Sequence, residues 1–306
     1  MILPHLIGNE ALKAALASLP PGGLGSAVLL DGPEGIGKRT AAEDLAQALL
    51  CQRPEKAPCG VCPACKRVLA GSHPDLIRLQ EPEPGKGIRL EQIRALRAQS
   101  FLRPSEAPYQ VFLLPGADAL NLPSQNALLK VLEEPANAVF LLLCENREAM
   151  LQTVRSRCKT FRLSPLSRAE LVRALAERMP DTDPALREQA ADQSAGLLGR
   201  ALFQLSGQEK PAFSAARAFF AARDAGELAV YLACQQAQKL SREEYGSFCE
   251  ECCRLLTEAV AKNRNPAEID LFEYLEKQRA MLSQNPSVTA LSGALAAFCG
   301  KSRARR

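Results

Sequence analysis

The feature that most constrains the fold of this chain is a glycine-rich stretch, GPEGIGKRT, at residues 32–40. The stretch follows an apolar run typical of a buried strand and precedes a helical pattern. In that context Gly32, Gly35 and Gly37 let backbone N–H groups wrap a phosphate, and Lys38 can reach its outer oxygens. The stretch therefore predicts a phosphate-binding loop between a strand and a helix.

The rest of the first half alternates apolar runs with helical patterns, as expected for a parallel α/β sheet. After the first strand at 26–32, we expect strands at 74–80, 109–116 and 138–146, and helices at 39–51, 90–99 and 122–134. The strands are apolar throughout, which is typical of a sheet that helices cover on both faces.

Beyond about residue 165 only amphipathic helical patterns follow, so the sheet domain is expected to end there. A weaker boundary is indicated at residues 206–213, SGQEKPAF, where glycine, proline and charge interrupt the helical periodicity. We therefore expect three domains, at residues 1–165, 166–207 and 208–306.

Composition narrows the class of protein. The 306 residues are 47% hydrophobic and 24% charged, which is ordinary for a globular protein. The net charge of +4 is too small by itself to indicate nucleic-acid binding. No apolar run approaches the roughly 18 residues that span a bilayer, and the first residues do not resemble a signal peptide. We expect a cytoplasmic protein.

The phosphate loop lacks residues that ATP hydrolysis needs. The position after Lys38, where a hydroxyl normally binds Mg²⁺, is Arg39, and Thr40 lies about 100° further round the helix. The acids expected at the end of the strand VFLL are replaced by Pro115 and Gly116. Both the metal ligand and the water-activating base are therefore lost.

Two other acids lie nearby in the sequence, Glu106 before this strand and Asp118 beyond its end. Neither position matches the strand end that holds the metal, so we interpret both as surface residues. ATPase activity is thus expected to be absent, whereas binding of ATP or ADP by Gly32, Gly35, Gly37 and Lys38 is left open.

Four of the eleven cysteines form a C-x7-C-x2-C-x2-C pattern, Cys51, Cys59, Cys62 and Cys65. Four thiolates can close a tetrahedral Zn²⁺ site. The alternative, four unligated thiols, would leave a loop that contains proline and glycine with little core to hold it. A closed shell has no open position for substrate, so the pattern predicts a structural zinc module at about residues 51–65.

The other seven cysteines occur mostly in apolar patterns and are interpreted as small core residues. Three of them, Cys249, Cys252 and Cys253, could share a helix face. A second metal site there would need a fourth ligand that the pattern does not supply.

Several motifs of the first half resemble bacterial DNA polymerase III clamp-loader subunits of the AAA+ superfamily. In that family's order, the sequence contains LIGNEALKAAL, GPEGIGKRT, the cysteine module, HPDL, LEQIRAL, NALLKVLEEP (126–135) and SRC (156–158). The resemblance is close over residues 1–165, whereas the later helices match only in general character. It implies an AAA+ core with a zinc-binding insertion, a small helical lid and an all-α collar that joins a five-subunit ring.

Within that family, the gamma and tau motor subunits keep an intact phosphate loop, whereas delta-prime subunits share the fold but are usually catalytically disabled. This sequence is most similar to the delta-prime type, and its length fits because tau carries a long C-terminal extension. The resemblance implies gamma/tau and delta as partners, with the sliding clamp and primer-template DNA met through the complex. The alternative is a short gamma-like ATPase motor, which Arg39, Pro115 and Gly116 disfavour.

The same resemblance gives Arg157, in the motif of Ser156, Arg157 and Cys158, a role as an arginine finger. It would reach across the ring interface to the γ-phosphate bound by the neighbouring motor subunit. The alternative is a solvated or salt-bridged surface cation, like Arg155 beside it.

The stretch SAGLLGRAL, which contains Gly199 and Arg200, resembles the lid motif that senses nucleotide in active relatives. With a defective phosphate loop, the alternative for Arg200 is a surface or packing role.

Two other functional classes fit parts of the sequence. A zinc protein that binds DNA on its own would need a dense basic stripe with interleaved aromatics, and only 5% of residues are aromatic. A small-molecule kinase fits the phosphate loop but needs a base and lid arginines that the sequence does not locate. The helices of 208–298 are expected either to mediate assembly or to form an ordinary core of their own.

Overall fold

The computed structural model describes residues 2–19, 23–80, 88–135, 137–206, 211–263, 266–282 and 286–304. The chain forms two compact units, Met1–Gly207 and Gln208–Arg306. Part of the boundary expected at 206–213, residues 207–210, lies outside the described residues. The further division expected near residue 165 stays a prediction.

The first unit contains the parallel sheet expected from the apolar runs, with the strand order β2-β3-β4-β1-β5. β1, β3 and β4 are buried at every position, because helices cover both faces of the sheet. β1 lies between β4 and β5, so the loop that follows it emerges beside the ends of both strands. The strands are β1 (Ala27–Asp31), β2 (Leu76–Arg78), β3 (Gln110–Leu114), β4 (Ala138–Cys144) and β5 (Lys159–Arg162).

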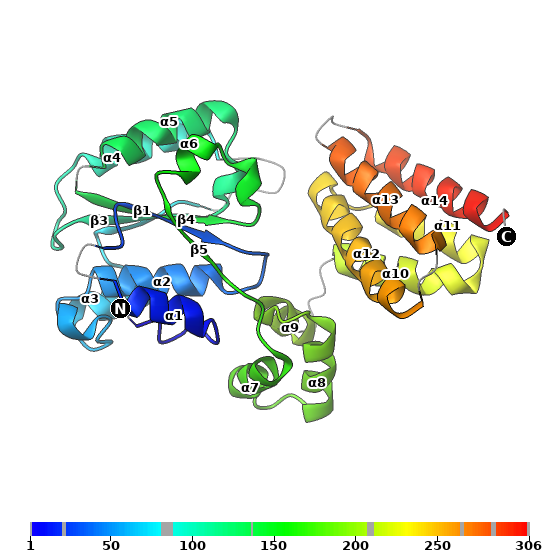
Figure 1. Ribbon diagram of the computed structural model, residues 1–306, viewed down its shortest axis with the longest axis horizontal. Helices are drawn as coiled ribbons and strands as arrows, with labels where there is room; N and C mark the ends of the chain where they lie inside the picture. Colours follow the sequence, from blue (N-terminus) through cyan, green and yellow to red (C-terminus); the bar gives the residue numbers. More distant parts are fainter. Residues whose placement is uncertain are drawn as a thin grey trace. The chain divides into compact units, whose positions relative to one another are not determined.

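Helices cover the two faces of the sheet in separate layers (Figure 1). One face carries α1 (Glu10–Ala17), α2 (Lys38–Leu49) and α3 (Pro63–Leu69), and the other carries α4 (Leu90–Ser100), α5 (Leu122–Glu133) and α6 (Gln152–Arg155). Each face has its own apolar core. On the second face, the rings of Phe112 and Phe140 from β3 and β4 stack with centroids 5.1 Å apart. Short 3-10 turns, η1 (Pro54–Lys56), η2 (Ala117–Ala119) and η3 (Arg147–Ala149), connect these elements.

Three further helices of this unit, α7 (Arg168–Arg178), α8 (Pro184–Gln193) and α9 (Leu198–Leu205), pack around a small apolar cluster of their own. α7 begins with a capping box in which Ser167 and Glu170 exchange hydrogen bonds. α8 is preceded by its N-cap residue Asp183, whose carboxylate accepts the backbone N–H of Ala185. The helical pattern expected after residue 165 is therefore confirmed.

The described elements of the second unit are all helices: α10 (Pro211–Ala225), α11 (Glu227–Ala237), α12 (Arg242–Asn263), α13 (Pro266–Met281) and α14 (Val288–Ala304). Their core contains Phe219, Tyr245 and Phe248, together with the three neighbouring cysteines of α12. The buried Tyr245 hydroxyl donates to Gln278 at 2.8 Å, so its polar group is satisfied. In the ranges that the structure describes, no helix has the length and apolar character needed to span a bilayer.

Candidate functional site

The glycine-rich stretch forms the loop between β1 and α2, as the sequence predicts. Gly35 and Gly37 have φ values of 79° and 105°, in the left-handed region that glycine adopts most easily. Gly37 is also the N-cap residue of α2, directly before the first helical residue, Lys38. The N-terminus of this helix therefore faces the loop, which is the geometry of a phosphate cradle.

Lys38, the phosphate-loop lysine, is bound to its own loop. Its Nζ donates to the carbonyl oxygens of Gly32 at 2.6 Å and Pro33 at 2.9 Å. The same atom lies 3.7 Å from a carboxylate oxygen of Glu145, which follows β4. A phosphate at this site would have to replace these contacts with its own oxygens.

The first turn of α9 lies against the phosphate loop. The backbone N–H of Gly199 donates to the carbonyl oxygen of Gly35 at 2.8 Å. Gly199 and Arg200, expected as part of a lid motif, are therefore brought to the loop, and Arg200 is half-buried there. How closely the two backbones approach is not indicated by the sequence pattern.

The ends of β3 and β4 are tied together by Asp118, a residue of η2. Its carboxylate accepts the backbone N–H groups of Glu145 at 3.1 Å and Asn146 at 2.9 Å. Asp118 is half-buried at the surface, and in addition to the surface position expected for it, its carboxylate serves as the acceptor that two strand-end amides need. Glu106 is exposed and paired with Arg67, as a surface residue would be.

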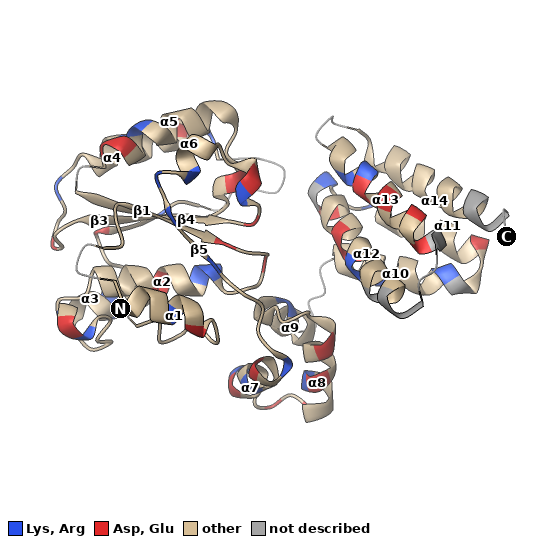
Figure 2. Cartoon of the chain, in the orientation of Figure 1, with Lys and Arg blue, Asp and Glu red and all other residues tan. Residues whose placement is uncertain are grey.

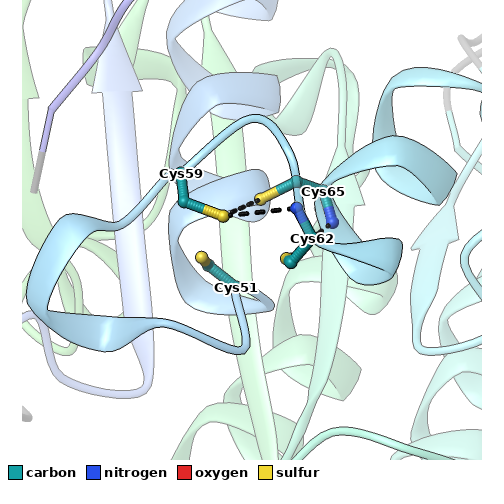
Figure 3. Close-up of side chains that lie close together, drawn as sticks. All are labelled: Cys51, Cys59, Cys62 and Cys65. Atoms are coloured by element: carbon teal, nitrogen blue, oxygen red, sulfur yellow. Dashed lines mark hydrogen bonds between the residues drawn. The ribbon is translucent and has the colours of Figure 1, made fainter.

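Four cysteine sulfurs meet beside the N-terminal half of α3, as the spacing predicts (Figure 3). The Sγ atoms of Cys51, Cys59, Cys62 and Cys65 all lie within 4.8 Å of one another. Backbone N–H groups donate to three of the sulfurs, those of Cys51, Cys59 and Cys62, each at 3.4 Å. The donor set and these N–H···S bonds fit a structural metal ion held by four thiolates.

The spacing of the sulfurs suits a small tetrahedral ion. A Zn–S distance of about 2.3 Å places the sulfurs of a regular tetrahedron about 3.8 Å apart, and the Cys59 and Cys65 sulfurs are 3.9 Å apart. Backbone N–H groups of Val61 and Cys62 lower the pKa of Cys59 to about 6, whereas burial raises the pKa of Cys65 to about 12. Four neighbouring thiolates would repel one another, and a divalent cation bound between them would offset this electrostatic repulsion.

Arg157 lies two residues beyond the end of α6, with its side chain 37% exposed. Its Nη1 donates to the carbonyl oxygen of Thr153 at 2.9 Å, and its Nη2 lies 2.7 Å from Oε1 of Glu133, the last residue of α5. Arg155 instead donates to Glu148 at 2.6 Å. The two neighbouring arginines are therefore paired with different carboxylates.

The start of α6 is fixed by Gln125, a buried residue of α5. Its Nε2 donates to the carbonyl oxygens of Leu120 at 3.0 Å and Ala149 at 3.2 Å. Its Oε1 accepts the backbone N–H of Leu151 at 2.6 Å, directly before α6 begins. Both N–H donors and one of the two oxygen lone pairs of the Gln125 amide are thus used, and these hydrogen bonds hold α5 and the start of α6 together.

Sequence reasoning gave no role to Glu133, Gln125 or Asp75, the last being a buried residue before β2 whose carboxylate accepts three backbone N–H groups. The signal available for Gln125 was a polar residue inside the apolar pattern of α5, and for Asp75 its place in HPDL. Glu133 had no local signal, because its partner Arg157 lies on another element.

Comparison with known proteins decides the family. Residues 8–167, just over half of the chain, match the family described as DNA polymerase III, delta subunit. The chain belongs to this family. Together with the relatives named subunit delta' that follow, this match confirms the resemblance to a clamp-loader subunit of the delta-prime type.

Curated relatives agree with this family. The DNA polymerase III subunit delta' of Pseudomonas aeruginosa is 40% identical over 172 residues, covering 56% of this chain and 52% of that protein. The subunit delta' of Bacillus subtilis is 33% identical over 175 residues, covering 57% of this chain and 51% of that protein. The chain thus matches about half the length of these relatives.

A solved structure from Thermotoga maritima, a DNA polymerase III gamma subunit-related protein, has a TM-score of 0.50 and 15% identity to this chain. The likeness covers 96% of this chain and 99% of that one. At this identity it bears on the fold alone, and the AAA+ fold expected from the motifs is confirmed.

Proposed function

We propose that this chain is a delta-prime-type subunit of the DNA polymerase III clamp loader that does not hydrolyse ATP itself. It supplies Arg157 as an arginine finger to the ATP site of a neighbouring motor subunit. The observation that carries the proposal is the contrast between the two sites: the chain's own phosphate loop lacks its metal ligands, whereas the SRC arginine is intact and partly exposed.

Loss of hydrolysis is supported by the residues at three positions. Arg39 cannot ligate Mg²⁺, and β3 is followed by Pro115 and Gly116 instead of carboxylates. Asp118, the nearest acid after β3, is engaged by two backbone N–H groups. The same features disfavour the gamma-like motor alternative.

A role in trans is supported by the placement of Arg157. A finger must project from a surface and deliver N–H donors to charge that develops on another subunit's phosphate. The Arg157 side chain is partly exposed, and its guanidinium contacts Glu133 of α5 and the carbonyl oxygen of Thr153 in α6.

We propose that Cys51, Cys59, Cys62 and Cys65 hold a structural Zn²⁺. The cluster gathers the ends of α2 and α3, and the Gln47 side chain of α2 donates to the carbonyl oxygen of Cys65 at 3.3 Å. The ion would therefore stabilise the insertion against the sheet domain without joining any reaction.

We propose gamma/tau and delta as partners in a five-subunit ring, with the helices of 208–306 as the collar. The sliding clamp and primer-template DNA would then be met through the complex. Lys and Arg residues are interspersed with Asp and Glu on the helices of both units (Figure 2). This distribution suits a subunit that acts within a complex better than a protein that binds DNA alone.

The decisive experiment is reconstitution of the loader with Arg157→Ala. We expect normal assembly but reduced clamp- and DNA-stimulated ATP hydrolysis and clamp loading, because a finger is typically worth ~10³-fold or more at the site it serves. Arg155→Ala, which breaks only the pair with Glu148, is the matched control. Unchanged hydrolysis and loading with Arg157→Ala would reduce the chain to a passive member of the ring.

A further inference from the structure

Within the described part of the chain, one carboxylate is paired with Arg157, that of Glu133 at the end of α5. The Nη2 to Oε1 distance is 2.7 Å. On the other side of the guanidinium, Nη1 donates to the carbonyl oxygen of Thr153 at 2.9 Å. Because a guanidinium is rigid and planar, two contacts from different elements fix both its position and its plane.

We propose that Glu133 is a positioning residue for Arg157 and holds the guanidinium in the orientation from which it meets the neighbour's nucleotide. The inference rests on the proposed function, in which Arg157 acts in trans. It adds a residue on a different helix that controls how well the finger is delivered.

The pair leaves Arg157 able to bind phosphate. A guanidinium has five N–H donors, and Thr153 and Glu133 each take one. Three N–H donors of Arg157 therefore stay available for a phosphate oxygen while the contacts with Thr153 and Glu133 are kept. The side chains of Arg157 and Glu133 are 37% and 49% exposed, so water screens the carboxylate and the pair does not cancel the charge of the finger.

The arrangement is specific to one glutamate. Glu134, the next residue, is exposed and forms no ion pair within the ranges that the structure describes. Arg155 is drawn to Glu148 instead of competing for Glu133. The chain therefore offers Glu134 as a control that matches Glu133 in charge, exposure and place along the sequence.

The test compares Glu133→Gln, Glu134→Gln and Arg157→Ala in the reconstituted loader. We expect Glu133→Gln to lower the kcat of stimulated ATP hydrolysis about three- to tenfold, because the released arginine spreads over several rotamers. The KM for ATP, subunit assembly and the unfolding temperature should stay at the wild-type values. Glu134→Gln should behave as the wild type in every assay.

A double variant separates positioning from an independent effect. When Arg157→Ala is already present, Glu133→Gln should cause no further loss if Glu133 acts through the arginine. An additional loss, or a kcat above the wild-type value for Glu133→Gln alone, would overturn the inference.

The inference and the proposed function fail in different ways. If Glu133→Gln hydrolysed ATP at the wild-type rate while Arg157→Ala was clearly defective, the positioning role of Glu133 would be overturned. The role of Arg157 as an arginine finger would stand. Wild-type hydrolysis with Arg157→Ala would overturn the finger itself, and the positioning role with it.

Discussion

The backbone N–H of Gly199 donates to the carbonyl oxygen of Gly35 at 2.8 Å, which brings α9 into contact with the phosphate loop. The two backbones can approach this closely because neither residue has a side chain. A Cβ on Gly199 would lie 2.8 Å from the Cα of Gly35, and one on Gly35 would lie 3.1 Å from the amide nitrogen of Arg200. The pair of glycines thus sets the distance at which α9 packs on the loop.

Gly199→Ala should therefore lower the unfolding temperature of the protein. The added methyl meets backbone atoms that cannot rotate away, and overpacking of this kind typically costs ~1–3 kcal/mol. Alanine gains about 1 kcal/mol over glycine inside a helix, which offsets only part of that cost. Thermal unfolding followed by circular dichroism measures the balance.

The matched control is Gly293→Ala in α14, where, apart from the adjacent residues and backbone of its own helix, no atom of the described residues lies within 4 Å of the added Cβ. That variant should keep or raise the unfolding temperature, because only the gain in helix propensity remains. If Gly199→Ala were as stable as Gly293→Ala, the close approach of α9 would not be a constraint.

Purified wild-type chain should show no steady ATP hydrolysis. Arg39, Pro115 and Gly116 occupy the positions where the metal ligand and both acids are expected. A phosphate-release assay with and without Mg²⁺ measures turnover, and Lys38→Ala identifies contamination, since a contaminant's activity would survive that change. Turnover that vanishes with Lys38→Ala would restore the motor hypothesis.

The fold was predictable because its signals are local. Apolar runs bounded by turn residues marked the strands, and the glycines at 32, 35 and 37 marked the loop that begins α2. Three of the four cysteines, Cys59, Cys62 and Cys65, were predictable as a cluster for the same reason, since short C-x2-C spacings keep their sulfurs close. Cys51 lies eight residues earlier and was predictable only as the fourth ligand that completes a tetrahedral site.

The contacts that position the candidate finger were not predictable, because they join elements far apart in the sequence. Gln125 reaches Ala149 and Leu151, and Glu133 reaches Arg157, across the packing of α5 on α6. A single sequence gives the helical pattern of each element but not which of their polar side chains will meet.

The purified chain should contain about one zinc ion, bound by the cluster at Cys51, Cys59, Cys62 and Cys65. Elemental analysis should show its loss in a Cys62→Ser and Cys65→Ser double variant, because two thiolates cannot close the tetrahedral shell. Cys299→Ser, in α14 of the other unit, should keep the metal. Zinc content that is unaffected by the double variant would place the ion elsewhere.

Asp75 should stabilise the first unit in a pH-dependent way. Its fully buried carboxylate accepts the backbone N–H groups of Ser105, Glu106 and Ala107 at 2.6, 2.8 and 2.9 Å. Burial alone would raise the pKa of Asp75, but these three hydrogen bonds outweigh burial and lower it. Asp75→Asn should therefore cost about 1–3 kcal/mol of the free energy of unfolding at pH 7.

The pKa of Asp75 is lower in the folded protein than in the unfolded chain, where it is about 3.9. The stabilisation is therefore complete above the unfolded-state pKa and is lost as the pH falls through the folded-state pKa. The difference between wild type and Asp75→Asn should therefore shrink below about pH 4. Urea unfolding of both proteins at pH 7 and in acid measures it. A difference that stays constant down to acid pH would show that the charge of Asp75 is not what stabilises the turn.

A surface of α11 should contribute to assembly. Leu228, Tyr231 and Leu232 are 71%, 49% and 50% exposed and lie three and four residues apart, so they share one face of the helix. Replacing Leu228 and Leu232 with serine should weaken co-purification with other loader subunits and leave the unfolding temperature almost unchanged, because exposed side chains add little to the core. Leu186→Ser on α8, 51% exposed, is the control. Full assembly of the double variant would exclude this face as a subunit contact.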